Sequence, residues 1–264
     1  MAFDAGAVAK HISSWLDSYS EKSGVGSYVV GVSGGIDSAV TASLCALTGR
    51  PTFLVNMPIH QAESEVSRSD ELIKSLTSKH SNVSSISVSL TEVFEALRAS
   101  LPAISDMSNG IAMANTRARL RMTTLYALAA ERGALVVGTG NKIEDFGVGF
   151  YTKYGDGGVD LSPIADLVKS EVFALGAHLE VPQSILDAAP TDGLWGDDRN
   201  DEDQIGASYP ELEIAMKQDE GFKAGNGSPN DLTGREAEVY AIYSRLNRIN
   251  QHKMQPIPVC KIPR

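Results

Sequence analysis

Residues 33–38, with the sequence Ser-Gly-Gly-Ile-Asp-Ser, combine the residue types best suited to binding an anion. They follow the apolar run at 28–32 and precede a helix-forming run at 39–44, so we expect a strand, a glycine-rich turn and a helix. The first N–H groups of a helix lack partners within the helix, and the helix dipole adds positive charge there. Glycine lets the backbone approach a ligand closely, and serine hydroxyls donate to phosphate oxygens. The segment therefore predicts a phosphate site at a helix N-terminus.

Asp37 is the residue that an anion site does not explain, because a carboxylate repels phosphate. A divalent cation between the two resolves the conflict, since Mg²⁺ prefers carboxylate and phosphate oxygens. The alternative is a structural turn in which Asp37 caps the helix. No Gly-Lys-Ser/Thr follows and no Gly-x-Gly-x-x-Gly occurs here, which excludes a Walker loop and a dinucleotide fingerprint at this turn. The segment resembles the pyrophosphate-binding loop of the N-type ATP pyrophosphatases, which cleave ATP to AMP and pyrophosphate while they adenylate a substrate.

A second candidate stretch is 138–144, which follows an apolar run and contains Glu144. Glu144 is a candidate second carboxylate for the cation that Asp37 would bind. The alternative is an ordinary acidic residue in the first turn of a helix, where the dipole favours negative charge. Glu144 alone does not decide between the two.

The third candidate stretch is 150–160, which mixes aromatic side chains, one lysine, two aspartates and three glycines without helical or strand periodicity. A loop so rich in binding side chains is more often functional than structural. Its aromatic rings can sandwich a flat ring, and Thr152 with Lys153 suits an anionic group. Asp156 and Asp160 suit hydroxyls, an ammonium ion or a cationic ring. We therefore expect this loop to bind a substrate.

The elements that must position these stretches alternate between strands and helices. Strands are expected at 28–32, 52–56, 83–88 and 134–138. Helices are expected at 5–19, 38–47, 62–78, 90–99, 112–132, 167–179, 210–217 and 233–250. Residues 100–110, 187–203 and 221–229 are expected to be exposed or mobile loops. The alternation predicts an α/β fold with a doubly wound parallel sheet flanked by helices. Ligands bind such sheets at the carboxyl ends of strands, so we place the site across the strand ends before Ser33 and Thr139.

Composition limits the class of protein. The chain has 264 residues, a net charge of −10 and a pI near 5.0, which argues against non-specific binding to nucleic acid or to anionic membranes. Its two cysteines, Cys45 and Cys260, are far apart and lie in no Cys-x-x-Cys, which argues against a zinc site or a disulfide framework. We see no signal peptide and no run of about 18 apolar residues. We expect one domain over 1–264, located in the cytoplasm.

Five segments occur together in an informative order: 33–38, 115–122, 138–139, 151–158 and 190–191. This set is similar to ammonia-dependent NAD⁺ synthetase and covers most of the chain, and the string Tyr-Gly-Asp-Gly within 151–158 is its most specific part. The resemblance implies an adenine nucleotide alpha hydrolase-like fold and a homodimer with a shared dinucleotide site. It also implies Mg²⁺ and a reaction in which ATP and nicotinate adenine dinucleotide give an acyl-adenylate, which ammonia converts to NAD⁺ and AMP.

The resemblance also assigns roles, residue by residue. The ATP-binding positions are Ser33, Gly34, Gly35, Ile36, Asp37, Ser38, Arg121, Thr139, Lys169 and Thr191. The substrate-binding positions are Arg119, Tyr126, Phe150, Tyr151, Thr152, Lys153, Asp156, Asp160, His252 and Lys253. Asp37 and Glu144 match the Mg²⁺ ligands. Catalytic roles fall to Asp37, to Lys169, which stabilises the departing pyrophosphate, and to Asp156, which by charge logic holds ammonium and removes its proton.

Helix geometry tests part of this assignment. At about 100° per residue, Arg117 and Arg121 share one helix face while Arg119 and Tyr126 share nearly the opposite one. Arg121 can therefore serve ATP while Arg119 and Tyr126 face a second ligand. The alternative is a solvated arginine face.

The chain departs from some relatives in three places. Asn56 and Met57 stand where some relatives carry an arginine near adenine, so Gln61 is a candidate replacement. One additional residue lies between Glu144 and 149. Gln204 falls where some members have an acidic residue.

The nitrogen source can be argued from the same sequence. Glutamine hydrolysis needs an additional domain with a nucleophilic cysteine, for which the sequence leaves no room, so we expect free ammonia. Two other functions remain open: an ATP pyrophosphatase that modifies tRNA, and a non-enzymatic nucleotide sensor. The acidic charge disfavours the first. The sensor would need neither the two proposed Mg²⁺ carboxylates nor the polar side chains of residues 152–160.

Overall fold

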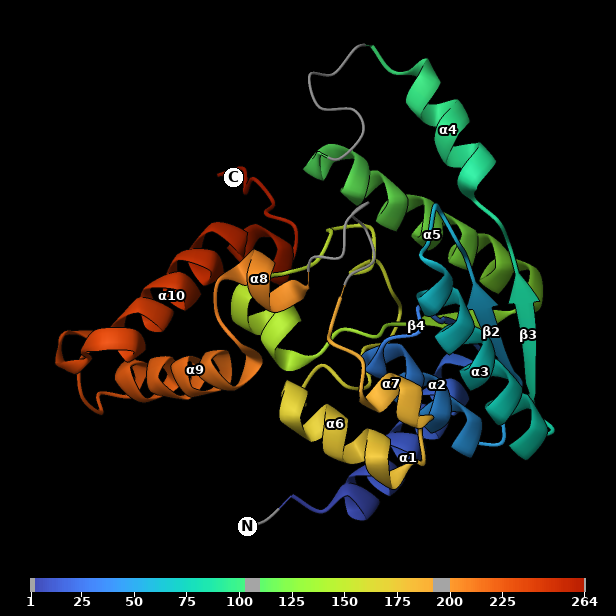
Figure 1. The fold of residues 1–264 in the computed structure, drawn as a ribbon, viewed down its shortest axis with the longest axis horizontal. Coiled ribbons are helices and arrows are strands. Elements are labelled where there is room, and N and C mark those ends of the chain that lie inside the picture. Colours follow the sequence, from blue (N-terminus) through green and yellow to red (C-terminus); the bar gives the residue numbers. More distant parts are fainter. Residues whose placement is uncertain (1–2, 103–109, 192–199, 264) are drawn as a thin grey trace.

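The computed structural model describes residues 3–102, 110–191 and 200–263. Within them a parallel sheet is built from β1 (Ser27–Gly31), β2 (Thr52–Asn56), β3 (Val83–Ser87) and β4 (Ala134–Val137), in the order β3-β2-β1-β4. Figure 1 shows these strands at one end of the molecule. The strand runs predicted from the sequence are confirmed with shifts of at most one residue at each end.

The helices in the described residues are α1 (Ala5–Ser23), α2 (Ile36–Leu47), α3 (Glu63–Lys79), α4 (Thr91–Ser100), α5 (Ile111–Arg132), α6 (Lys169–His178), α7 (Gln183–Leu186), α8 (Asp201–Ile205), α9 (Tyr209–Lys223) and α10 (Gly234–Met254). They alternate with the strands as far as β4, with both α4 and α5 between β3 and β4, and α6 to α10 follow the last strand. A π-helix, η1 (Ile143–Val148), and a 3₁₀ turn, η2 (Pro229–Asp231), complete the set. The prediction of a flexible loop at 221–229 is wrong at both ends, because α9 extends to Lys223 and η2 begins at Pro229. Of the loops expected at 100–110 and 187–203, residues 103–109 and 192–199 lie outside the described residues.

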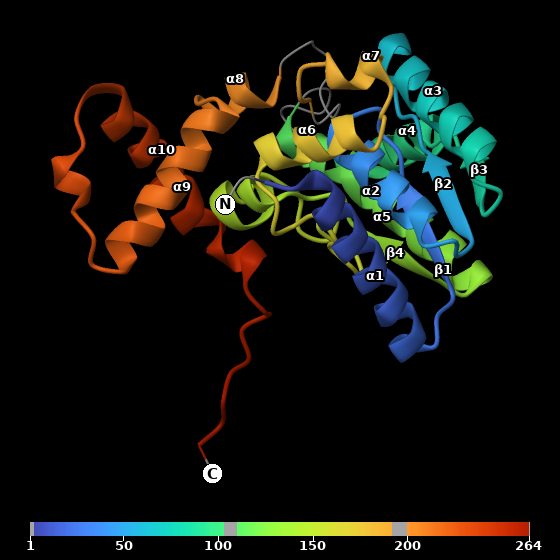
Figure 2. The same cartoon turned by 90° about the horizontal axis from the view of Figure 1, so that it is seen from below.

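Strand side chains alternate between the two faces of the sheet, and each face is covered by helices. Tyr28 and Val30 of β1 pack in one apolar core with residues of α1, α2, α3 and α6. Val29 packs on the other face in a core with Phe94 of α4 and Met113 of α5. Figure 2 shows the sheet between these helix layers. The doubly wound α/β fold predicted from the sequence is confirmed.

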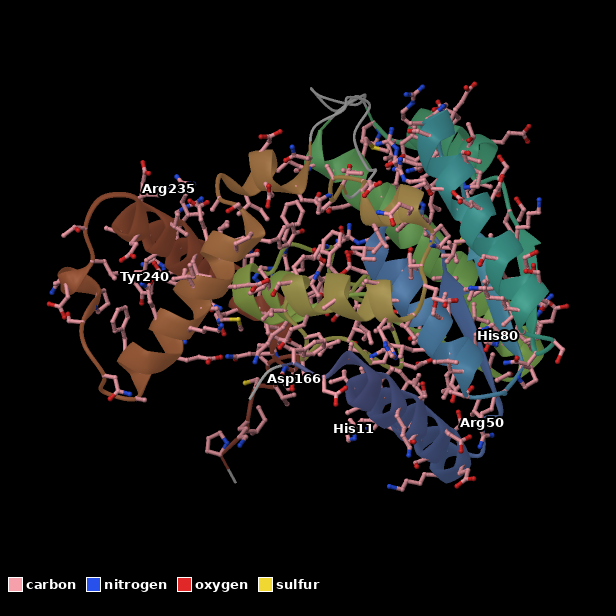
Figure 3. All side chains as sticks on the ribbon, turned by 60° about the horizontal axis from the view of Figure 1, so that its bottom comes forward. His11, Arg50, His80, Asp166, Arg235 and Tyr240 are labelled. Carbon is pink, nitrogen blue, oxygen red and sulfur yellow. The ribbon has the colours of Figure 1, made fainter. Side chains whose placement is uncertain are left out.

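A third apolar core joins η1 to α9 and α10, and it contains Ile143, Val148, Leu212 and Tyr243. Figure 3 shows Arg235 and Tyr240 at this end of the molecule, away from His80 and Arg50 beside the sheet. Arg235 Nε donates to Glu211 Oε1 at 2.7 Å and ties α10 to α9. The α9–α10 pair is therefore anchored to the sheet through η1, which carries Glu144.

The strand order places the site. β1 lies between β2 on one side and β4 on the other, so the chain reverses its direction of travel along the sheet at β1 and β4. Such a switch point leaves a crevice at the carboxyl ends of the two strands. No helix of the described residues is long and apolar enough to cross a membrane.

Candidate active site

The loop after β1 is held in shape by its own serines. Ser38 Oγ donates to the Gly35 carbonyl at 2.9 Å and accepts from Ser33 N at 3.3 Å. Gly34 has a φ of +83°, which favours glycine. α2 begins at Ile36 with Gly35 as its N-cap and without a side-chain capping bond, so the alternative in which Asp37 caps this helix is wrong. The uncapped N–H groups of α2 open on a cavity of about 720 Å³.

Lys169 joins the two carboxylates that the sequence singled out. Its Nζ lies 2.6 Å from Asp37 Oδ2 and 2.9 Å from Glu144 Oε1. The three side chains come from α6, α2 and η1, and their exposed fractions are 4%, 17% and 17%. Burial alone would lower the pKa of Lys169, but Asp37 and Glu144 reverse this and raise it above its ordinary value. Lys169 is therefore a fixed cation at the base of the phosphate loop.

Two residues that sequence reasoning did not single out hold this cluster. Asn141 is fully buried, donates to Asp37 Oδ1 at 3.0 Å, and accepts from the backbone N of Ile143 and of Glu144. Tyr209 at the start of α9 donates to Glu144 Oε1 at 2.6 Å. Burial raises the pKa of Tyr209, and the neighbouring carboxylates raise it further, so this hydroxyl stays a donor. Asn141 and Tyr209 therefore fix where the two carboxylates point.

Asp37 and Glu144 are suited to bind a divalent cation and supply two of the ligands that it needs. Asp37 and Glu144 offer hard carboxylate oxygens within hydrogen-bond distance of one ammonium group. No group of three or more histidine, cysteine or acidic side chains suited to a metal occurs among the described residues. Mg²⁺ commonly keeps one or two protein carboxylates and takes its other ligands from substrate phosphates and water, which matches this pair.

The loop at 150–158 forms another wall of the cavity. Asp156 Oδ1 accepts from Thr152 N at 2.9 Å, and Thr152 Oγ1 donates to Asn115 Oδ1 on α5 at 2.7 Å. An added Cβ on Gly155 would lie 2.8 Å from Ala118 Cβ, so this turn sits directly on α5. The segment therefore faces the same cavity as the phosphate loop, with Phe150, Tyr151 and Lys153 in its lining.

The segment after Glu144, where we expect one residue more than in some relatives, lies in the π-helix η1. Such π-turns occur often at functional sites. Gly149, with a φ of +67°, ends η1, and an added Cβ there would lie 2.4 Å from Asn250 Cβ on α10. α10 thus packs directly against the end of the π-helix.

α10 donates hydrogen bonds to carbonyl groups at the end of η1 and just beyond it, through three side chains on one face. Asn247 Nδ2 donates to Gly147 O at 2.7 Å and Asn250 Nδ2 to Val148 O at 2.8 Å. Lys253 Nζ donates to Gly149 O at 2.7 Å and Tyr151 O at 2.8 Å. We expected Lys253 to bind the substrate, and in the structure its ammonium group instead donates to two backbone carbonyls of the loop. Lys153 donates likewise to the His252 carbonyl.

Asn250→Ala is expected to cost about 1–3 kcal/mol of stability, because it leaves the Val148 carbonyl without its donor in a half-buried contact. The loss should also loosen the 150–158 loop, which we expect to bind a substrate, and so raise the KM for that substrate. Urea unfolding and steady-state kinetics check this. Asn226→Ala is the matched control, since Asn226 is exposed between α9 and η2. Equal unfolding midpoints for both variants would contradict this role of Asn250.

The arginines of α5 lie on separate faces, as helix geometry predicted. Arg121 Nε donates to Met57 O at 3.1 Å and Nη2 to Gln61 Oε1 at 2.7 Å, while Arg119 donates to the Lys153 carbonyl. Arg117 is buried with its guanidinium 4.3 Å from the Phe94 ring centroid, so the alternative of a solvated arginine face is wrong for Arg117.

Two expected substrate residues are not brought into the cavity of a single chain. Tyr126 donates to Asp160 Oδ1 at 3.0 Å, and Asp160 Oδ2 accepts from Val136 N at 2.9 Å. Burial and Asp160 raise the pKa of Tyr126 to about 12. Neither side chain belongs to the cavity lining, whereas Thr139, Thr191 and His252 do.

Comparisons with known proteins agree on one family. The NAD synthase family model matches residues 8–257. The NH₃-dependent NAD⁺ synthetase of Carboxydothermus hydrogenoformans is 36% identical over 241 residues, which are 90% of this chain and 90% of that protein. The structure of NMN synthetase from Francisella tularensis superposes with a TM-score of 0.84 at 32% identity and covers 99% of this chain and 100% of that one. NH₃-dependent NAD synthetase from Campylobacter jejuni shares the fold, with a TM-score of 0.78 at 22% identity over 98% of this chain and 100% of that one.

Proposed function

The chain belongs to the NAD synthase family, and on that premise we propose that it amidates nicotinate adenine dinucleotide to NAD⁺ with ATP and ammonia. The observation that carries this is the Lys169 bridge between Asp37 and Glu144 at the phosphate loop, which shares one cavity with the 150–158 loop. The first site suits the polyphosphate of ATP. The second suits a flat ring that carries an acid group.

The reaction balances in two steps. The nicotinate carboxylate attacks the α-phosphorus of ATP, and pyrophosphate leaves as the acyl-adenylate forms. Ammonia then attacks the acyl carbon, loses a proton, and expels AMP as the amide forms. Adenylation is needed because a carboxylate has no leaving group that ammonia can displace.

The chain's own residues support the first step by holding charge. The α2 N–H groups and the Ser33 and Ser38 hydroxyls donate hydrogen bonds to phosphate oxygens. Lys169 lies where negative charge develops as pyrophosphate leaves. Asp37 and Glu144 would hold Mg²⁺. When bound, this ion supplies electrostatic stabilisation of the phosphates and of the leaving group.

Asp156 serves the second step. Its carboxylate lines both the main cavity and an adjoining one of about 190 Å³. A carboxylate there attracts ammonium and accepts the proton whose loss frees the nucleophile. We assign the nitrogen to ammonia because neither cysteine suits glutamine hydrolysis. Burial raises the pKa of Cys45 within α2, and Cys260 lies in the exposed tail.

A second candidate substrate is nicotinate mononucleotide. The observation that favours it is the likeness to the Francisella tularensis protein called NMN synthetase, at 32% identity over nearly the whole chain. The chemistry at the phosphate loop is the same for both substrates, so only the part of the substrate beyond the nicotinate ribose distinguishes them.

One assay tests the function and separates the candidates. The purified chain is given ATP, Mg²⁺ and ammonium with either nicotinate adenine dinucleotide or nicotinate mononucleotide, and AMP and the amide product are measured. We expect NAD⁺ and AMP in equal amounts, with a larger kcat/KM for the dinucleotide. Preference for the mononucleotide would favour the second candidate. In a further reaction with tRNA in place of either acid, AMP formed only there would indicate the tRNA-modifying alternative. No turnover with either acid would contradict the proposal.

The same assay with glutamine tests the nitrogen source, because equal turnover with glutamine would contradict direct use of ammonia. We further propose that the chain forms one domain and acts in the cytoplasm as a homodimer. Tyr126 and Asp160, which lie outside the cavity of one chain, would serve the shared dinucleotide site of that dimer. Light scattering after gel filtration checks the oligomeric state.

A further inference from the structure

Arg68 of α3 lies against the phosphate loop and lines the same cavity. Its Nε donates to the Gly34 carbonyl at 3.2 Å. An added Cβ on Gly34 would lie 2.6 Å from the Glu65 carbonyl oxygen and 3.2 Å from Arg68 Cβ, so the loop rests directly on α3. The guanidinium group is therefore held at the edge of the loop that receives phosphate.

The three lysines that line the cavity all donate to protein acceptors, and so do the lining residues Arg119 and Arg121. Lys169 lies between Asp37 and Glu144, and Lys253 donates to the Gly149 and Tyr151 carbonyls. Lys153 donates to the His252 carbonyl. Within the described part of the chain, the side chain of Arg68 makes one polar contact, the bond from Nε to Gly34, and no ion pair. Its two terminal nitrogens remain available to a ligand.

The charges at the loop call for such a cation. Asp37, Glu144 and Lys169 together carry one net negative charge, and a bound Mg²⁺ ion would change this sum to one net positive charge, whereas the polyphosphate of ATP carries several negative charges. Loop N–H groups and hydroxyls donate hydrogen bonds but add no full positive charge. A guanidinium presents paired N–H groups that match two phosphate oxygens at once.

We infer that Arg68 binds the part of ATP that leaves as pyrophosphate, as a cation that adds to Lys169 and is fixed to the loop through Gly34. This inference rests on the proposed function. The resemblance of the sequence to known synthetases did not single out Arg68, because a lone arginine on a charged helix carries no motif. The competing role is purely structural, in which Arg68 only fastens the loop to α3.

Equilibrium binding of ATP, pyrophosphate and AMP to the full chain, measured by calorimetry with Mg²⁺ present, separates the two roles. Arg68→Gln is expected to weaken the binding of ATP and of pyrophosphate by about 10-fold or more, while the affinity for AMP changes by less than about twofold. Arg68→Lys should recover part of the loss, since it restores the charge without the paired geometry. Arg245→Gln, which removes the same charge from an exposed position of α10, should change none of the three affinities.

Two outcomes overturn the inference. Unchanged pyrophosphate affinity in Arg68→Gln would show that the guanidinium does not touch this ligand. An equal loss for ATP, pyrophosphate and AMP, with a lowered melting temperature, would show that Arg68 only shapes the loop. Failure of the unaltered chain to bind ATP would instead overturn the proposed function, and the inference with it.

Discussion

Replacing Lys169 with methionine is expected to lower kcat/KM for NAD⁺ formation by about 10²- to 10³-fold. Lys169 is buried, remains charged, and lies within 2.9 Å of both carboxylates at the phosphate loop, so methionine removes a fixed cation where pyrophosphate departs. The melting temperature should also fall, because Asp37 and Glu144 lose the ion that compensates their burial. Kinetics measured well below that temperature isolate the chemical effect.

Lys142→Met is the matched control. Lys142 lies at the start of η1, and its Nζ is 3.4 Å from Asp166, whose side chain is 97% exposed. We expect nearly unchanged kinetics for this variant. Activity of Lys169→Met within about tenfold of the unaltered chain would contradict the role given to the bridge.

Asp156→Asn is expected to lower ammonia-dependent amidation by about 10²- to 10⁴-fold, the usual range for loss of a catalytic proton acceptor. An asparagine oxygen can still accept the Thr152 N–H bond, so the substitution removes charge while it keeps the loop contact. Adenylation precedes the use of ammonia, so exchange of labelled pyrophosphate into ATP should persist in this variant. Both rates together locate the defect in the second step.

Asp166→Asn is the control for Asp156→Asn, because Asp166 is an exposed carboxylate outside the cavity lining. We expect it to leave both rates unchanged. An Asp156→Asn enzyme that amidates as fast as the unaltered chain, with the loop still folded, would rule out proton transfer through this carboxylate.

The sheet was predictable because β1, β2 and β4 are short, mainly apolar runs bounded by glycine, proline and polar residues, while β3 mixes valine and isoleucine with serine. The run 28–32 and the helix that follows the phosphate loop carry local signals that do not depend on distant parts of the chain. η1 was not predictable in the same way. Carbonyl groups of its last turn accept hydrogen bonds from Asn247 and Asn250, and the Gly149 carbonyl that follows accepts from Lys253, about a hundred residues later in the sequence.

The site was predictable to the extent that its residues lie in motifs. Asp37, Glu144 and Lys169 each carried a separate signal, but their convergence on one ammonium group follows only from the packing of α6 and η1 beside α2. Tyr209 was missed because it stands at an ordinary helix start, where Ser208 and Glu211 form a capping box. Tyr126 and Asp160 were assigned to the substrate, yet in one chain they bind each other and β4.

We propose that this site activates a carboxylate by joining it to AMP, and the transfer of a carboxylate oxygen to AMP tests this most directly. Nicotinate adenine dinucleotide labelled with ¹⁸O in its carboxylate is converted with unlabelled ATP and ammonium, and the products are analysed by mass spectrometry. We predict one ¹⁸O atom in each AMP and none in pyrophosphate, since the carboxylate oxygen stays on the α-phosphorus. AMP without ¹⁸O, or label in the pyrophosphate, would contradict the account.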